Sequence, residues 1–109
     1  MISCQKSDTK FPDVEVFFEF NGLREKHIYD GFRPVHLLSD QIYTSGVHHY
    51  FGTESIPSNG SVRGTITFIT PEAYAHCLSI GSVIPIYDLP NIIGHATVIQ
   101  IFNPILASD

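Results

Sequence analysis

The sequence has few positive charges and few cysteines, and each shortage excludes a class of protein. Its 109 residues include six Lys and Arg against eleven Asp and Glu, for a formal net charge of −5. Six dispersed cations are too few to neutralise a nucleic-acid backbone, which disfavours autonomous nucleic-acid binding. Two cysteines, Cys4 and Cys77, cannot form the dense disulfide framework of small secreted domains, so we expect both to be reduced.

Long apolar runs and targeting segments are missing as well. No stretch of about 18 apolar residues occurs, so the sequence predicts no transmembrane helix. The polar start, residues 1–6, lacks the apolar core of a signal peptide, and we expect a cytoplasmic protein that does not associate with a membrane. A hydrophobic fraction of 43% is nevertheless sufficient for one packed domain and excludes intrinsic disorder.

The motifs that carry catalysis, metal binding and nucleotide binding are also absent. There is no Gly-x-x-x-x-Gly-Lys-Ser/Thr phosphate loop, no Gly-x-Ser-x-Gly elbow and no Cys-x-x-Cys pair. None of the six histidines has a partner at i+4, and His48 and His49 would point to opposite faces of a strand. We interpret Cys77, beside His76, as a small buried hydrophobe. The sequence therefore predicts a non-enzymatic protein with no cofactor, metal or GTP.

Alternating hydrophobicity predicts an all-β domain. Apolar residues at 14, 16, 18 and 20 alternate with acidic residues at 15 and 19, as in a half-buried strand. Similar patterns predict strands over residues 9–20, 35–38, 42–50, 61–70, 83–87 and 92–102, with a short helical turn at 71–78. Such regularly spaced strands form a barrel or a sandwich. The expected core consists of Val14, Val16, Phe18, Val62, Ile66, Phe68, Val83, Val98 and Ile101.

Several motifs occur in an order that resembles a known family. Gly-Phe-Arg-Pro at residues 31–34 opens one strand, Gly-Val at 46–47 lies in the next, and a Pro/Gly loop at 57–60 precedes the long strand 62–71. Ile-Ile-Gly-His-Ala-Thr-Val-Ile at 92–99 ends the series. The set is similar to the third, C-terminal domain of elongation factor Tu, in which comparable Gly-Tyr-Arg-Pro, Thr-Gly, Pro-Gly-Asp, His-Pro and Val-Gly-x-Gly-Val-Val segments follow one another.

The resemblance implies a closed six-stranded antiparallel barrel over nearly the whole chain. We therefore assign residues 1–9 to a flexible N-terminal tail, 10–104 to a single β-barrel domain and 105–109 to a C-terminal tail. The family's GTPase domain is absent, and its Arg-Glu-Gly-Gly-Arg segment aligns with residues 86–91, which contain no arginine. In the factor this region helps to hold the T stem of aminoacyl-tRNA, so the loss of positive charge disfavours tRNA binding here.

Two loops are the candidate recognition sites, because the strands of a closed barrel fill its interior. These are residues 21–30, which are charged, and residues 48–59, where Tyr50, Phe51 and Ile56 have no alternating pattern to bury them. The predicted partner-binding residues are Arg24, Arg33, Tyr50 and Phe51, with Glu54 and Asp30 as steering charges. The alternatives are that the second loop plugs one barrel end, and that Arg33 pairs with Asp30 or Asp40 in a structural role.

The aromatic content supports a binding function. A small barrel has limited interior volume, so some of its many aromatic residues should reach the surface. The residues concerned are Phe17, Phe32, Tyr43, Tyr50, Phe51, Tyr74, Tyr87 and Phe102, together with Ile56, Leu89 and Ile93. We expect a protein-binding module, such as an immunity, antitoxin or regulatory protein. The alternative is a tRNA-binding or RNA-binding accessory of translation.

Overall fold

The computed structural model describes residues 11–39 and 41–108. Its elements are strands and short 3-10 turns, which follow one another along the chain as β1 (Val14–Phe20), β2 (Ile28–Tyr29), β3 (Val35–Ser39), β4 (Ile42–Tyr50), β5 (Ser55–Ile56), β6 (Ser61–Phe68), η2 (Pro71–Tyr74), β7 (Val83–Asp88), β8 (Asn91–Ile101) and η3 (Pro104–Leu106). The predicted strands and the turn after residue 70 are confirmed, and the short strands β2 and β5 lie in the two loops.

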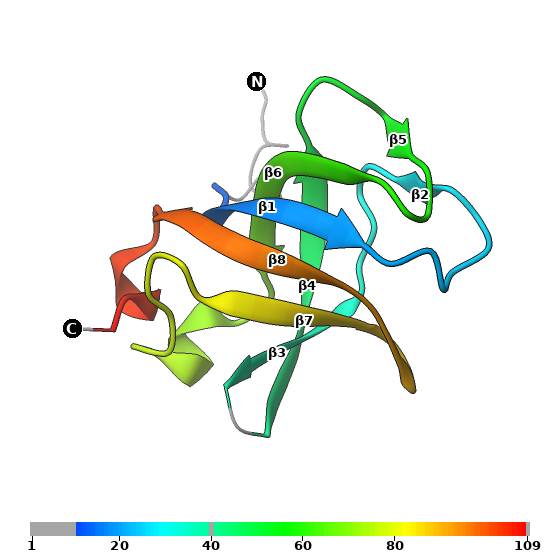
Figure 1. The fold of residues 1–109 in the computed structure, drawn as a ribbon. Coiled ribbons are helices and arrows are strands. Elements are labelled where there is room, and N and C mark those ends of the chain that lie inside the picture. The colour runs from blue at the N-terminus through cyan, green and yellow to red at the C-terminus, as the bar shows by residue number, and fades with distance from the viewer. Residues whose placement is uncertain (1–10, 40, 109) are drawn as a thin grey trace, which may run out of the picture.

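Six of the strands close into a barrel in which every neighbouring pair is antiparallel (Figure 1). The order around the barrel is β1-β6-β4-β3-β7-β8, and β8 pairs with β1 to complete the circle. The remaining strands, β2 and β5, form a separate two-stranded ribbon. The predicted closed six-stranded antiparallel barrel is confirmed, and the barrel has no open edge strand that could pair with another chain.

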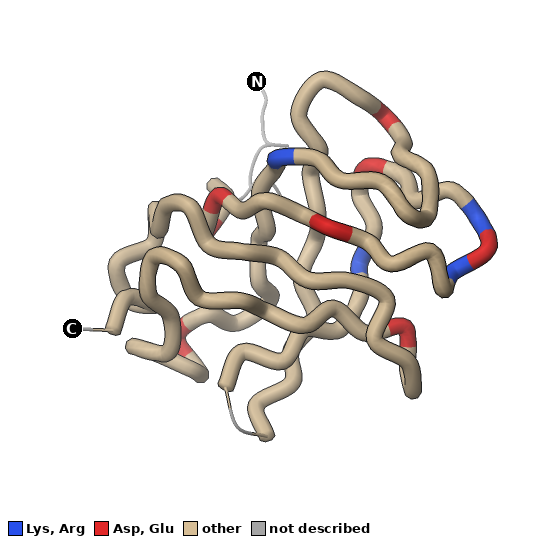
Figure 2. Tube along the Cα trace, in the orientation of Figure 1, with Lys and Arg blue, Asp and Glu red and all other residues tan. Residues whose placement is uncertain are grey.

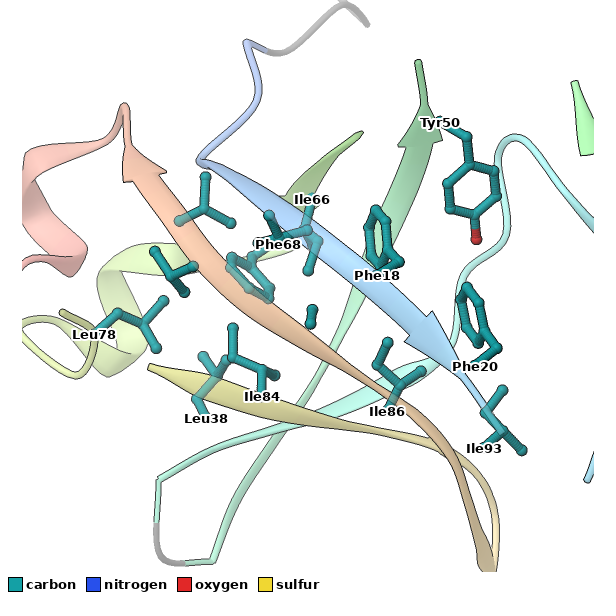
Figure 3. Packing of buried hydrophobic residues seen from close by; sticks show 14 of the residues in the cluster. Phe18, Phe20, Leu38, Tyr50, Ile66, Phe68, Leu78, Ile84, Ile86 and Ile93 are labelled. Carbon is teal, nitrogen blue, oxygen red and sulfur yellow. The ribbon is translucent and has the colours of Figure 1, made fainter. Parts of the chain in front are cut away.

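The core lies inside the barrel and contains a large cluster of apolar side chains (Figure 3). Six of the predicted core residues are buried: Val14, Val16, Phe18, Ile66, Phe68 and Val98. Val62 and Ile101 are partly buried against them. The prediction for Val83 is wrong, because its side chain is 57% exposed and Ile84 and Ile86 point inward instead. Since β7 is apolar at consecutive positions, its sequence does not indicate which parity faces the core.

The chain remains packed beyond the predicted domain boundary at residue 104. Leu106 is fully buried. The amide of Leu78 donates to the carbonyl of Leu106 at 2.9 Å, and the amide of Ser108 donates to the carbonyl of Leu78 at 2.7 Å. The folded domain therefore includes residues 105–108 of the segment that we assign to a C-terminal tail. The predicted tail at residues 1–9 lies outside the described residues.

A buried carboxylate fastens one end of the barrel. Asp13 is 4% exposed. Its Oδ2 accepts a hydrogen bond from the amide of Phe68 at 2.7 Å, and its Oδ1 accepts one from Nδ2 of Asn103 at 2.9 Å. The start of β1 is thereby connected to the end of β6 and to the segment after β8.

We predict that Asp13→Ala lowers the free energy of unfolding by about 3 kcal/mol, because two hydrogen bonds to a buried charged acceptor are lost. Urea unfolding followed by circular dichroism measures the change. Glu19→Ala is the matched control, since Glu19 is an exposed acidic residue of the same strand, and it should change stability by less than about 0.5 kcal/mol. Equal effects of the two substitutions would contradict a fastening role for Asp13.

Candidate functional site

The two loops that the sequence identifies lie side by side (Figure 1). Ile28 pairs with Ile56 and Tyr29 pairs with Ser55, so that the loops form the β2–β5 ribbon. The amide of Asp30 also donates to the carbonyl of Glu54 at 2.8 Å. We call the exposed surface of residues 21–33 and 49–59 the loop surface. Backbone pairing between its two halves holds this surface in one arrangement.

Asp30 connects the loop surface to the barrel. Its Oδ1 accepts a hydrogen bond from the backbone amide of Tyr50, the last residue of β4, at 2.8 Å. The same oxygen lies 2.9 Å from Nδ1 of His49, which donates to it. One carboxylate therefore fixes the position of the chain where β4 enters the second loop.

Exposed aromatic and acidic side chains occur together on the loop surface. The side chain of Phe51 is 41% exposed and its ring packs edge-on against the ring of His49. Glu54 is exposed, and Tyr29 is 63% exposed. The sequence analysis did not identify Tyr29 as a site residue. The parity of β2 could have indicated it, since an inward Ile28 places its neighbour outward.

Tyr50 and Ile56 lie beneath this surface, not on it. Their exposed fractions are 1% and 6%. The expectation that these residues lack a burying pattern is wrong, because Gly46, His48 and Tyr50 share the inward parity of β4 and Ile56 packs inward from the ribbon. Tyr50 is therefore placed to support the loop surface from below.

The two arginines of the predicted site have different environments. Arg24 donates from Nη1 to Oδ2 of Asp88 at 2.9 Å, and its guanidinium carbon lies 4.9 Å from the centre of the Phe32 ring. Arg33 is exposed and makes no ion pair with a described residue, so it does not pair with Asp30. Asp40, the other partner considered for Arg33, lies outside the described residues.

Positive charge is sparse over the described part of the chain (Figure 2). It contains four Lys and Arg residues against eight Asp and Glu residues. Two of the four cations are already paired, Arg24 with Asp88 and Arg63 with Glu15. Only Lys26 and Arg33 among the described residues are left without an acidic partner, which is a weak basis for binding a phosphate backbone.

A second apolar patch lies on the outer wall of β3, β4 and β7. The rings of Tyr43 and Tyr87 meet edge-on with their centres 5.5 Å apart, and Tyr43 is 55% exposed. Leu89 is 65% exposed and lines a hollow with Tyr43 and Val35. This patch fulfils the expectation that Tyr43 and Leu89 reach the surface. Ile93, in contrast, is 2% exposed, so the same expectation is wrong for Ile93.

Two histidines meet inside the barrel, and one of them contacts Tyr50 beneath the loop surface. His36 of β3 and His48 of β4 are fully buried, and their Nε2 atoms are 2.8 Å apart. Nδ1 of His48 lies 2.8 Å from the hydroxyl oxygen of Tyr50, and Nδ1 of His36 lies 3.1 Å from the carbonyl oxygen of Thr44. We call these three side chains the histidine chain. The sequence analysis considered the histidines only as metal ligands, and no local pattern of the sequence indicates that His36 and His48 meet.

The partners of the histidine chain determine where its hydrogens lie. A carbonyl oxygen only accepts, so His36 donates from Nδ1 to Thr44 and accepts at Nε2 when it is neutral. His48 must then donate from Nε2 and accept at Nδ1 from the Tyr50 hydroxyl. All ring nitrogens are satisfied in this single arrangement, which explains how two imidazoles can be buried among apolar side chains.

Burial keeps the histidine chain neutral. It lowers the pKa of His36 to about 4, against a smaller opposing effect of the bond to Thr44. Burial and the neighbouring His36 lower the pKa of His48 well below its usual value. The pKa of Tyr50 is raised by burial and by the charge of Asp30, while Arg24 opposes this rise.

The described residues contain no group of three or more His, Cys, Asp and Glu side chains that could hold a metal ion. Burial raises the pKa of the Cys77 thiol, which disfavours the reactive thiolate. Nδ1 of the neighbouring His76 lies 3.0 Å from the carbonyl oxygen of Ala107. In the same part of the chain, no helix is long and apolar enough to cross a membrane.

Comparison with known proteins does not assign the chain to a family. No family model matches it, and no curated protein matches it.

Proposed function

We propose that the protein is a non-enzymatic protein-binding module that recognises its partner through the loop surface. The main observation in support is that two exposed aromatic side chains, Phe51 and Tyr29, lie on two loops that the β2–β5 ribbon joins. The acidic residues Asp30 and Glu54 lie on the same loops and are linked by a backbone hydrogen bond. Rigid aromatic side chains are frequent anchors of protein interfaces, and pre-ordered loops lose little entropy on binding. The exposed rings favour a partner with an apolar pocket, whereas the three basic and three acidic residues of the loop surface favour neither sign of charge on that partner.

The order of sequence motifs and the closed six-stranded barrel support a relation to the third domain of elongation factor Tu. A protein of this kind could occupy surfaces that the factor contacts, as an immunity, antitoxin or regulatory protein. The charge supports the protein-binding proposal over the tRNA-binding alternative, because half of the described cations are already paired with carboxylates.

Affinity capture from the native host, combined with a tRNA gel shift, tests the proposal. We expect a protein to be captured in stoichiometric amount and no tRNA shift at micromolar protein in low salt. A salt-dependent tRNA shift without a captured protein would instead establish the tRNA-binding alternative.

We predict that Phe51→Ala weakens binding of the captured partner by about 2 kcal/mol, or roughly 30-fold, with a nearly unchanged melting temperature. Its partial exposure means that truncation opens no core cavity. Titration calorimetry and thermal unfolding measure the two quantities. Tyr43→Ala is the matched control, because it removes an exposed aromatic ring from the other patch. If Tyr43→Ala weakens binding and Phe51→Ala does not, the outer wall is the binding site. A large loss of stability in Phe51→Ala would instead show that Phe51 is a plug.

A further inference from the structure

We propose that the histidine chain is an acid-sensitive latch: protonation inside it breaks one of its buried hydrogen bonds and loosens the loop surface above it. This inference does not depend on the identity or existence of a binding partner. It rests on the hydrogen-bond geometry of His36, His48 and Tyr50 and on the backbone contacts that connect these residues to the loops.

A count of hydrogens shows why one proton is enough. The neutral chain contains three hydrogen bonds, which join Thr44 to His36, His36 to His48 and His48 to Tyr50, and each of them takes one hydrogen atom. A fourth hydrogen atom has no acceptor left within the chain. If it is added at Nε2 of His36, two N–H donors face each other over 2.8 Å. If His48 changes tautomer to relieve this clash, the Tyr50 hydroxyl loses its acceptor. In both cases one buried donor is left without an acceptor, which costs free energy. The intact neutral chain is therefore favoured at neutral pH and becomes less favoured as the pH falls.

No charged group of the described residues bonds to the ring nitrogens of His36 and His48. The rings around these two histidines belong to Phe18, Phe20, Phe32 and Phe68. The buried carboxylates at the start of β1 have other partners: Asp13 accepts from the Phe68 amide and from Asn103, and Glu15 pairs with Arg63. Glu19 of β1, His49 of β4 and Arg63 of β6 are exposed. Tyr74 of η2 bonds to the hydroxyl of Thr44 and not to the chain. Asp30 and Arg24 act on the chain only at its Tyr50 end.

The backbone of His48 forms hydrogen bonds directly to the first loop. The carbonyl of His48 accepts from the amide of Gly31 at 2.8 Å, and the amide of His48 donates to the carbonyl of Phe32 at 2.8 Å. The amide of Tyr50 donates to Asp30, whose own amide bonds to the carbonyl of Glu54. A shift of the His48 and Tyr50 side chains therefore acts on both halves of the loop surface through adjacent backbone bonds.

Nuclear magnetic resonance of the unmodified protein tests the proposed arrangement first. At pH 7.5 the ring nitrogens should show the Nδ1–H tautomer for His36 and the Nε2–H tautomer for His48. The reverse tautomers, or a protonated imidazole at this pH, would overturn the proposal without any mutation.

Amide hydrogen exchange then tests the coupling to the loops. Between pH 6.5 and 5, the protection factors of the Gly31, His48 and Tyr50 amides should fall at least about tenfold more than that of Val98, whose amide bonds to Ser82 away from the latch. A uniform fall across the barrel, or none, would contradict a local latch.

Two variants identify the responsible group. The triple variant His36→Leu, His48→Leu, Tyr50→Phe removes every polar group of the chain together, and its loop amides should lose the extra pH dependence. Asp30→Asn keeps an acceptor for the Tyr50 amide and should retain that dependence. Should Asp30→Asn remove the dependence instead, the carboxylate is the acid-sensitive group and the latch proposal fails. If the triple variant does not fold, the tautomer and exchange results on the unmodified protein still decide the outcome.

Discussion

Replacing Gly64 by alanine is expected to lower the free energy of unfolding by at least about 3 kcal/mol, a large part of the 5–15 kcal/mol typical of a domain this size. Gly64 lies in β6 opposite Val16 of β1 and Tyr50 of β4. A Cβ atom at this position would be 2.0 Å from the carbonyl oxygen of His49 and 2.9 Å from a ring carbon of Phe18. The backbone carbonyl of His49 cannot move aside as the end of a flexible side chain can. The strand β4 would therefore have to move away from β6.

Urea unfolding of Gly64→Ala against the unmodified protein measures this effect. Gly52→Ala is the control, because its Cβ would meet no atom within 4 Å and its cost arises only from a positive φ of 76°. We expect about 1–2 kcal/mol for this control. If Gly64→Ala costs no more than Gly52→Ala, the close approach of β4 and β6 is not a constraint on the fold.

Lowering the pH from 7 to 4 is expected to destabilise the protein by about 3 kcal/mol through His36 alone. The pKa of His36 is lowered from 6.5 to about 4 in the folded state, so between these pH values the unfolded chain binds the proton more strongly. The contribution of His36 to the free energy of unfolding is therefore complete above pH 6.5. It decreases as the pH falls below this value, by up to about 1.4 kcal/mol per pH unit. The lowered pKa of His48 acts in the same direction.

The same reasoning predicts a second loss of stability at alkaline pH. The pKa of the buried Tyr50 hydroxyl is raised above 10, so the unfolded state releases its proton first and stability falls as the pH rises past 10. Urea unfolding across this pH range should show a plateau between about pH 7 and 10. The triple variant of the histidine chain should have a shallower acid slope, whereas the exposed His95→Gln should match the unmodified protein. An unchanged slope in the triple variant would assign acid unfolding to other groups.

The comparison of Tyr50 with Phe51 shows where prediction from the sequence ends. The two residues are adjacent and aromatic, and the sequence analysis placed both at the binding surface. Tyr50 ends β4 with its side chain in the core, whereas Phe51 lies in the turn that follows. The inward face of β4 is hard to recognise in the sequence because it includes the polar side chains of His48 and Tyr50. Those side chains are tolerated inside because His36, from another strand, completes their hydrogen bonds.

The sequence by itself determined the all-β class, the positions of the six barrel strands, and the inward face of β1 and β6, because alternation with a period of two is a local property of each segment. The closed barrel itself followed from the resemblance. Only the tertiary structure decided the inward parity of β7, the pairing of the two loops through β2 and β5, and the meeting of the histidines. Each of these depends on contacts between residues distant in the chain, so their physical cause does not lie in any local pattern of the sequence.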